Sequence, residues 1–261
     1  MACIPPGFCN APQSGRTGGE GMAILYILLS IALLCFLTAI ELLSGPFKMS
    51  TRLVNFQAWT LYLGSTVLIL PIVHIAVPAS LVGQAPRWVT IVLFFFVMDL
   101  GEYLFHRAQH AIPILWRMHS FHHSDEDMNA TTSNRHFWAE PVIKSVTIWP
   151  AAALLVHPSP AALTVYFWVS FWHYVCHSKI DFHLGRWSWL LNTPGYHRRH
   201  HSTLPEHYNS NFAALFPIFD VISGTYRPPD GFPPTGLSEQ AQTTADILLW
   251  PLRSRRAAKA P

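Results

Sequence analysis

The sequence predicts an all-α integral membrane protein, and two observations lead to this fold class. First, 12% of the 261 residues are charged and 51% are hydrophobic, whereas soluble domains carry about 25% charged residues. Second, several apolar runs reach the length of about 20 residues that a helix needs to cross a bilayer. The net charge of +3 is small and the basic residues are scattered, so no nucleic-acid partner is expected.

The N-terminal part of the chain contains two predicted spans. Residues 22–43 form an apolar run without a small-residue cleavage site, which indicates a membrane anchor and not a removed signal peptide. Residues 56–82 are long enough for a second span, in which Pro71 predicts a kink. The Pro- and Gly-containing residues 1–21 have little power to form structure, so we expect a disordered leader there.

The later apolar segments end in polar residues or are short. Residues 88–110 begin as a third span and end in the polar sequence HRAQH. Residues 142–157 and 160–177 are separated by a few residues, with Pro158 and Pro160 at the joint. This arrangement predicts a helical hairpin that enters and leaves the membrane on one side. We therefore expect about four transmembrane helices and a single helical domain.

The distribution of basic residues predicts the orientation of these helices. Lys48 and Arg52 lie between the first two spans, whereas Arg87 alone lies between the second and third. If the first loop is cytoplasmic, the third span and the hairpin also end on the cytoplasmic side. A multi-pass protein with its polar motifs at the cytoplasmic face is expected.

Ten histidines fall into four groups at the ends of these segments. The sequences HRAQH and HYVCH have i, i+4 spacing, which places both rings on one face of a helix. The sequences HSFHH and HRRHH each end in an adjacent pair. The members of the four groups are His106, His110, His119, His122, His123, His173, His177, His197, His200 and His201.

This spacing indicates metal binding. Histidines four residues apart can bind one ion from successive turns, while adjacent histidines diverge by about 100° and can reach two different ions. One ion takes about four to six ligands, so ten imidazoles favour two ions. For any single pair, an ordinary core or interface position remains the alternative, but four groups at one membrane face favour ligands.

Carboxylates accompany the first histidine group. Asp99 and Glu102 lie on the same helical stripe as His106 and His110, because the spacings of 3, 4 and 4 return to one face. We expect the two carboxylates to accept imidazole N–H groups and to fix the rings. A solvated helix end is the alternative for Glu102. The acidic run at residues 125–127 is expected to be a solvated loop.

The order of these motifs resembles the fatty acid hydroxylase/sterol desaturase superfamily, a group of integral-membrane di-iron oxygenases. The resemblance runs from about residue 92 to residue 228. It includes NATTSNRHFWAEP after the second histidine group, NTPGYHRRHHS around the fourth and NSNFAALFPIFDVISGTYRPP downstream. The sequence Asn211-Phe212-Ala213 stands where the family has Asn-aromatic-Gly, which is a mild departure.

The resemblance implies a four-helix membrane body with a cytosolic helical cap that holds two iron ions. It carries His173 and His177 over as ligands from the hairpin. It also places His136, Asn211 and Asp220 around the ligands, although a loop position is the alternative for His136 and for His207. No side chain is given a direct catalytic role, since the metal centre carries the chemistry.

The implied domain organisation is a leader at 1–21, N-terminal transmembrane helices at 22–87, a hydroxylase-like catalytic region at 88–228 and a C-terminal tail at 229–261. The implied reaction uses O2 and two electrons to hydroxylate a lipid, which could be a fatty acyl chain, a sterol or a carotenoid or other terpenoid. Desaturation at the same site is the close variant. The chain has no room for a fused cytochrome, so a separate ferredoxin or cytochrome b5-type donor with its reductase is expected. Zinc can replace iron in purified protein.

Two hypotheses come from other functional classes. A metal transport or storage protein would carry polar residues along its spans near the bilayer midplane, whereas the histidines here sit at one end of the spans. A structural membrane protein with a relict site would bind metal without activity. The sequence does not determine the substrate or the oligomeric state.

Overall fold

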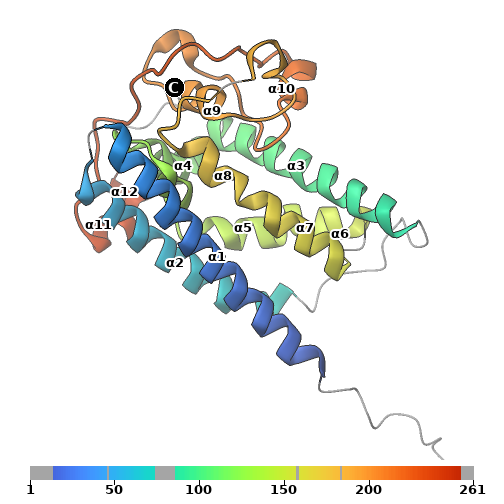
Figure 1. Cartoon of the computed structure of the whole chain (residues 1–261). Helices are drawn as coiled ribbons and strands as arrows, with labels where there is room; N and C mark the ends of the chain where they lie inside the picture. The colour runs from blue at the N-terminus through green and yellow to red at the C-terminus, as the bar shows by residue number, and fades with distance from the viewer. Residues whose placement is uncertain (1–13, 46, 74–85, 157–158, 183, 254–261) are drawn as a thin grey trace, which may run out of the picture.

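Long helices form the body of the molecule, and short helices with loops cover one end of it (Figure 1). The computed structural model describes residues 14–45, 47–73, 86–156, 159–182 and 184–253. Within these residues the regular elements are helices, and Ser202 and Thr235 form an isolated β-bridge. The all-α fold class is therefore confirmed for the described part of the chain.

The body and the covering end follow one another along the chain. The body consists of α1 (Ser14–Ser44), α2 (Met49–Val73), α3 (Arg87–Ala111), α4 (Pro113–His123), the 3-10 helix η1 (Ala130–Asn134), α5 (Glu140–Val146), α6 (Ile148–Leu155), α7 (Pro160–Ser170) and α8 (Trp172–His177). The covering end, termed the cap (residues 184–243), contains η2 (Gly185–Trp187), α9 (Pro194–His200), η3 (Pro205–His207) and α10 (Ile218–Ser223). Helices α11 (Thr244–Leu248) and α12 (Trp250–Arg253) return to the body.

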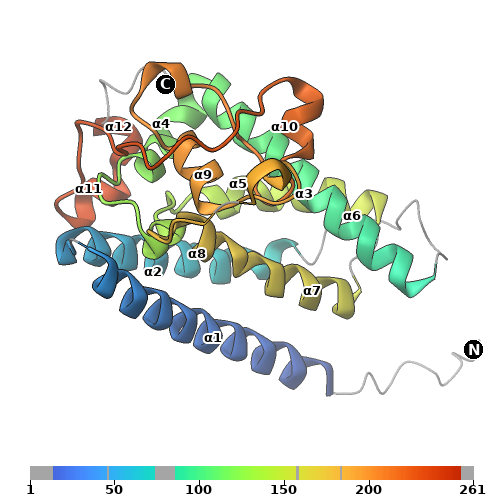
Figure 2. The ribbon, with the colours of Figure 1, turned by 45° about the horizontal axis from the view of Figure 1, so that its top comes forward.

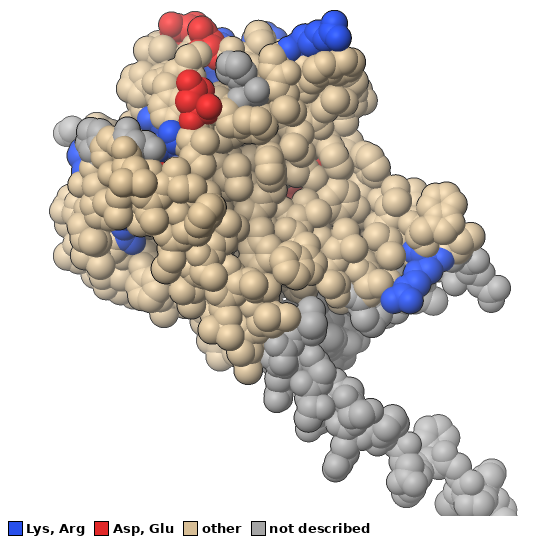
Figure 3. Space-filling model, viewed as in Figure 1, with Lys and Arg blue, Asp and Glu red and all other residues tan. Residues whose placement is uncertain are grey.

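Two helices are long and apolar enough to cross a membrane, among the residues that the structure describes. They are Ile24–Leu43 of α1 and Arg87–Ala111, which is the whole of α3. Large apolar side chains such as Leu28, Phe36 and Leu104 are exposed on these helices, as expected for a surface in contact with lipid. Figure 3 shows a largely uncharged body, with most of the charged side chains of this face around the cap.

Helices α1 and α2 both begin earlier than predicted. Helix α1 starts at Ser14, so the last residues of the expected disordered leader are helical, while residues 1–13 lie outside the described part. Helix α2 starts at Met49, before the apolar run. Arg52 and Asn55 of this first part are buried and donate hydrogen bonds to Glu41 and Asp125. The end of the expected second span falls in residues 74–85, outside the described residues.

A buried ion pair connects these two helices to the rest of the body. Arg52 Nη2 donates to Glu41 Oε2 at 2.7 Å, and both side chains are almost fully buried. Glu41 Oε1 accepts the backbone N–H groups of Ala130 and Lys179, each at 2.9 Å. Helix α1 thus contacts η1 and the end of α8, and it lies along the outside of the body (Figure 2).

Each of the two predicted hairpin helices is divided. Thr147 (φ −122°, ψ −77°) separates α5 from α6, and Pro150 in α6 has no N–H to offer to the preceding turn. Between α7 and α8, the Phe171 N–H bonds to the Trp168 carbonyl at 3.3 Å, in a tighter turn than that of an α-helix. The joint between the two arms, residues 157–158, lies outside the described residues.

Close packing fixes α3 against α6. Phe94 and Met98 of α3 are buried against Ile148 and Ala152 of α6. At Gly101, a Cβ atom would lie 2.7 Å from Ile148 Cγ2, which is far inside van der Waals contact. A glycine therefore lets the two helices approach, and it positions the C-terminal half of α3.

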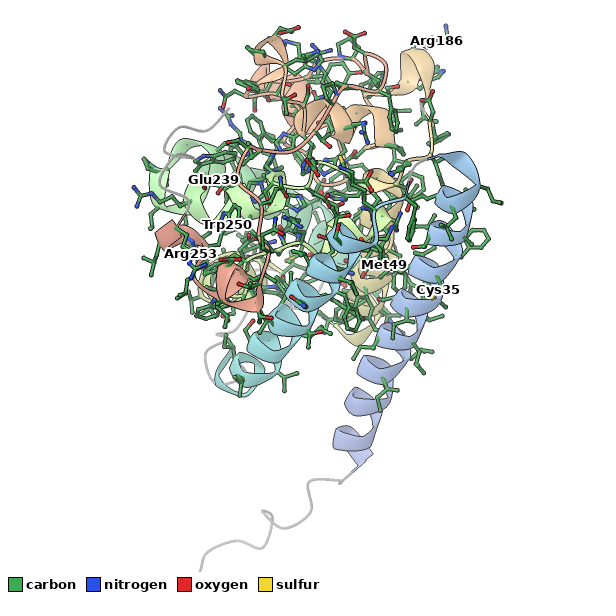
Figure 4. All side chains as sticks on the ribbon, turned by 90° about the vertical axis from the view of Figure 1, so that its left-hand side faces the viewer. Cys35, Met49, Arg186, Glu239, Trp250 and Arg253 are labelled. Carbon is green, nitrogen blue, oxygen red and sulfur yellow. The ribbon has the colours of Figure 1, made fainter. Side chains whose placement is uncertain are left out.

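The C-terminal helices secure α4. The Trp250 ring is buried, and its Nε1 donates to Ser120 Oγ at 2.9 Å. It also packs on Phe121 with ring centroids 5.4 Å apart. Figure 4 shows Trp250 within the body, Arg186 at the far end of the cap and Cys35 on α1.

Candidate metal centre

Nine of the ten predicted histidines gather into two clusters inside the molecule. Within each cluster, the candidate ligand atoms all lie within 4.8 Å of one another. The five-histidine cluster contains His106, His110, His119, His123 and His200, and the four-histidine cluster contains His122, His177, His197 and His201.

Adjacent histidines divide between the two clusters. The rings of His122 and His123 are at 87° to each other, and those of His200 and His201 are at 86°. This divergence follows from the 100° step between neighbouring residues of a helix. The clusters touch where His123 and His201 stack, with centroids 4.3 Å apart.

Helix boundaries bring the histidine groups together. Helix α3 ends before Ile112, which is extended (φ −101°, ψ 118°), and Pro113 starts α4 at its first helical position. The chain therefore changes direction between His110 and His119. Helix α9 starts after Thr193, whose side chain accepts the Tyr196 N–H, and Pro194 follows at the first helical position.

Backbone carbonyls orient four of the imidazole rings. In each case Nδ1 faces a carbonyl oxygen, which requires an N–H at Nδ1 and leaves Nε2 with a lone pair in the neutral ring. The pairs are His106 with Phe212 (2.7 Å), His122 with Arg135 (3.3 Å), His177 with His173 (2.7 Å) and His200 with Ser210 (2.9 Å).

The free nitrogens of these rings point at one another. His122 Nε2 and His177 Nε2 both carry lone pairs and lie 3.2 Å apart. His197 Nε2 lies 2.9 Å from His177 Nε2, and His200 Nε2 lies 3.1 Å from His123 Nε2. Nitrogens bound at about 2.1 Å to one ion are about 3.0–3.4 Å apart. Facing lone pairs at this separation repel unless a cation lies between them, so the donor set fits a metal ion in each cluster.

Burial keeps the rings in the neutral form that binds metals. Desolvation lowers the pKa of His200 to about 4. Desolvation and neighbouring histidines lower the pKa values of His119, His123 and His201 well below the ordinary value. Both ring nitrogens of His119 are buried without a hydrogen-bond partner among the described residues, as expected for an imidazole that binds a metal ion.

Among the described residues, Asp99 and Glu102 make no hydrogen bond to an imidazole, contrary to the prediction. Asp99 accepts the backbone N–H groups of Leu215 and Phe216, each at 3.0 Å. Glu102 accepts from Lys144 Nζ at 2.7 Å. The prediction was wrong about these contacts because both partners lie far along the chain, where helical periodicity gives no information.

Asp220 and Asn211 shape the loop that supplies two of the orienting carbonyls. Asp220 accepts the N–H groups of Phe212 (3.0 Å) and Ala213 (2.7 Å) and the hydroxyl of Tyr196. Asn211 has a left-handed backbone (φ 60°), which asparagine tolerates, and its amide donates to the Tyr196 carbonyl at 3.1 Å. Both residues thus act on the rings through the loop and not by direct contact.

Three further histidines lie around the clusters. His136 stacks on His122 with centroids 4.6 Å apart, and its Nδ1 lies 3.1 Å from Glu140 Oε2. His173, expected as a ligand, is brought into neither cluster, because α8 presents its carbonyl to His177 and directs its ring elsewhere. His207 is buried in the cap outside both clusters.

The acidic run at residues 125–127 is not a solvated loop throughout. Asp125 is buried and accepts from Asn55 Nδ2 (2.9 Å) and Thr132 Oγ1 (2.6 Å). Buried Arg135 donates to Asn55 Oδ1 at 3.0 Å and to the Phe121 carbonyl at 3.0 Å. This network could not be predicted from the sequence, although Arg135 falls within the family-like NATTSNRHFWAEP. The network holds α4 and η1 together beside His122.

A pocket of about 220 Å³ reaches both clusters from the side of the cap. Two cap loops form its walls, joined by the Thr203 N–H, which donates to the Pro234 carbonyl at 3.0 Å. At Gly236 (φ 105°) a Cβ atom would lie 2.6 Å from Glu126 Cα, so glycine is needed there. The pocket is lined by His123, His201, Ser202, Thr203, Tyr208, Gly236, Leu237 and Ser238.

Comparison with known proteins gives the same central region. The model of the fatty acid hydroxylase family matches residues 91–225, about half of the chain. Alkylglycerol monooxygenase of Xenopus tropicalis is 36% identical over 136 residues, which cover 52% of this chain and 30% of that protein. The Homo sapiens alkylglycerol monooxygenase is 34% identical over 136 residues, covering 51% of this chain and 29% of that protein.

A bacterial relative is also similar. Ornithine lipid hydroxylase OlsE of Rhizobium tropici is 28% identical over 146 residues, which cover 56% of this chain and 44% of that protein. The chain thus spans less than half of the length of these relatives. No solved structure matches the chain.

Proposed function

The chain belongs to the fatty acid hydroxylase family, and on that premise we propose that it is a membrane oxidoreductase that hydroxylates an unactivated C–H bond of a lipid. The proposal rests mainly on the convergence of nine imidazoles into two clusters. In the four-histidine cluster, the Nε2 lone pairs of His122 and His177 face each other at 3.2 Å. Two kinds of relative named as a monooxygenase and a lipid hydroxylase support the same reaction class.

We assign one iron ion to each cluster. Five imidazoles would hold the ion in one cluster and four would hold the ion in the other, within the four to six ligands that such an ion takes. Imidazole also binds zinc, so zinc can replace iron in purified protein. His173 is not assigned as a ligand, since its ring lies outside both clusters.

The ions, when bound, would supply the reductive activation of O2 that attack on a C–H bond requires. The overall reaction consumes one C–H bond, one O2 molecule, two electrons and two protons, and it yields one C–OH group and one water molecule. The chain holds the Nδ1 protons of four rings on backbone carbonyls, so that their Nε2 atoms stay available as ligands. Burial of the clusters excludes bulk water from the reacting groups.

The membrane arrangement follows from the apolar helices and the positions of the histidines. We propose that α1, α2, α3 and the divided hairpin α5–α8, counted as one unit, form a membrane body of four parts, with the cap in the cytoplasm. The catalytic region is then residues 88–228, between the N-terminal helices at 22–87 and the tail at 229–261. A separate ferredoxin or cytochrome b5-type protein supplies electrons, and the pocket beside His123 and His201 offers a path for O2.

Lipid analysis with metal analysis tests the proposal. The protein is expressed in hosts that make different lipids, and the lipids are examined by mass spectrometry. A product heavier by one oxygen means hydroxylation, whereas a product lighter by two hydrogens means desaturation. Ion uptake into vesicles without any lipid product would favour a transport protein.

Variants separate the site from its surroundings. His200→Ala removes a member of the five-histidine cluster, and we expect it to lose activity and metal. His207→Gln, a matched change at a buried histidine outside both clusters, should keep both. Full activity and metal content in His200→Ala would overturn the ligand assignment.

A further inference from the structure

Part of the cap lies against the middle of α3. Asp99 is the central residue of this helix, twelve residues from Arg87 and twelve from Ala111, and so about 18 Å from either end. Its carboxylate accepts the backbone N–H groups of Leu215 and Phe216, each at 3.0 Å. If α3 crosses the membrane, this contact lies well below the membrane surface.

Aromatic contacts extend the packing along α3. The Phe216 ring stacks on Phe96 with centroids 5.0 Å apart, and the ring of Phe219, in α10, lies 5.7 Å from that of Tyr103. Figures 1 and 2 both show α10 beside α3. Residues 212–223, termed the apolar cap segment, therefore follow α3 over about two helical turns.

The non-helical part of the apolar cap segment makes its hydrogen bonds inside the protein. The N–H groups of Asn192 donate to three successive carbonyls, those of Ala213 (3.0 Å), Ala214 (2.9 Å) and Leu215 (2.8 Å). The buried Asp220 carboxylate accepts the Ala213 N–H at 2.7 Å. In water, solvent could satisfy these groups. At membrane depth, non-helical backbone is tolerated only where protein satisfies it, as it does here.

The exposed face of α10 is apolar and continues the apolar surface of α3. Ile222 of α10 keeps 76% of its surface exposed. On α3, the exposed side chains of Phe96, Leu100 and Leu104 form one stripe at i, i+4 spacing. Because Phe96 also stacks on Phe216, the stripe of α3 borders the apolar cap segment, and the two surfaces form one apolar region.

The apolar cap segment carries one charge in its sequence, and an exposed arginine follows it. In residues 208–226 the one charged residue is Asp220, which is fully buried. Arg227 comes next and is exposed. Arg107 of α3 is exposed as well, and its Nη1 donates to Tyr103 Oη at 3.3 Å. Tyrosine and arginine at the end of an apolar surface are typical of the membrane–water interface.

We propose that the apolar cap segment is embedded in the bilayer, with the Ile222 side chain among lipid acyl chains and Arg227 at the head groups. This inference rests on the proposed membrane arrangement, in which α3 is a span, and it does not depend on the reaction. The remainder of the cap stays outside the bilayer. The segment begins at Phe212, whose ring centroid lies 5.5 Å from that of His200. It therefore forms a wall between the acyl chains and the five-histidine cluster.

Spin labels on single cysteines test this placement. Three native cysteines are first replaced by serine and the buried fourth is kept; the three are Cys3, Cys9 and Cys35. A nitroxide is then attached in turn at Ile222→Cys, Arg227→Cys, Asp230→Cys and Leu28→Cys of the zinc-loaded protein in lipid nanodiscs. Electron paramagnetic resonance measures collisions of the label with O2, which concentrates in the bilayer, and with a nickel chelate, which stays in water.

Two of the labels are references for the other two. Leu28 is exposed on the predicted span in α1, and Asp230 is largely exposed in the cap, eight residues after Ile222. We expect the ratio of O2 to nickel collisions at Ile222→Cys to match that at Leu28→Cys and to be several-fold higher than at Asp230→Cys. The ratio at Arg227→Cys should lie between the two references.

Two outcomes at Ile222→Cys would overturn the inference. A ratio equal to that of Asp230→Cys would place α10 in water. A label shielded from both reagents would show that protein covers α10, and cross-linking between Ile222→Cys chains would identify a second copy as the cover.

The Leu28→Cys reference and a lipid assay separate this inference from the proposed function. If Leu28→Cys behaves like Asp230→Cys, the membrane arrangement fails and the embedded segment fails with it. If the iron-loaded protein oxidises a lipid while Ile222→Cys lies in water, the inference fails alone. If no lipid is oxidised while Ile222→Cys matches Leu28→Cys, the proposed reaction fails and the embedded segment stands.

Discussion

Replacing Asp99 by asparagine should loosen the five-histidine cluster, although the side chain touches no ligand. Each Asp99 oxygen accepts one backbone N–H, from Leu215 and from Phe216, at 3.0 Å. The same loop supplies the carbonyls of Phe212 and Ser210, which hold His106 and His200. Asparagine keeps one acceptor and turns an NH2 group towards the other N–H.

The size of the effect follows from the lost bond. A hydrogen bond to a charged group contributes about 1.5–3 kcal/mol. We expect a net loss of about 1.5–3 kcal/mol, which lowers Tm by about 3–12 °C at this chain length. Loss of support around a ligand commonly reduces metal affinity about 10–100-fold, so the five-histidine cluster should release its ion first.

Thermal unfolding in detergent and metal content after dialysis against graded chelator measure these two effects. Asp230→Asn is the matched control. Asp230 lies largely exposed in the cap, and its ion pair with Arg199, at 3.6 Å, is screened by solvent. It should leave both measurements unchanged. If Asp99→Asn retained metal and Tm as well as Asp230→Asn does, the link from α3 through the loop to the ligands would be wrong.

Four further predictions concern other parts of the structure. Because burial lowers the pKa of His200 to about 4, protonation should displace the metal only as the pH falls towards 4; dialysis at pH 7, 6, 5 and 4 checks this, and complete loss at pH 6 would contradict it. Glu41→Gln should destabilise the protein by about 3–5 kcal/mol, since it leaves buried Arg52 without its partner; chemical unfolding measures this against Glu126→Gln, an exposed pair member that should have little effect. Gly236→Ala should cost at least about 1–3 kcal/mol, because a Cβ atom would lie 2.6 Å from Glu126 Cα; Gly231→Ala, with open space around it, should cost less in the same Tm measurement. His173→Ala should keep the metal content of the wild type, whereas His201→Ala should lose metal; equal losses would show that His173 is a ligand.

Local periodicity predicted the long apolar helices and three of the four histidine groups, whereas in HYVCH only His177 enters a cluster. The i, i+4 spacing of His106 and His110 and the adjacent pairs depend only on helix geometry, and the structure divides His122 from His123 as that geometry requires. The break at Thr147 was not predictable from hydrophobicity, because apolar residues continue on both sides of it.

Long-range polar contacts could not be predicted from the sequence. Asp99 and Leu215 are 116 positions apart, and nothing in the stripe formed with His106 indicates a partner so distant. The acidic run that Asp125 begins is typical of a solvated loop. Asp125 is nevertheless buried, because it accepts a hydrogen bond from Asn55, which is 70 positions away in the sequence. The number of spans and the side of the membrane that the cap occupies remain predictions.

The two ligand sets alternate along the chain, and this order has a consequence for biosynthesis. His119 and His123 of one set enclose His122 of the other, and both sets also require α9, through His200 and His197. Neither ion can acquire its full set until α9 has left the ribosome, long after α1 and α3 have been made. In the proposed two-ion site, iron delivery would therefore be a late step, after membrane insertion. A chain interrupted before α9 would present a half-formed chelate to any divalent cation nearby.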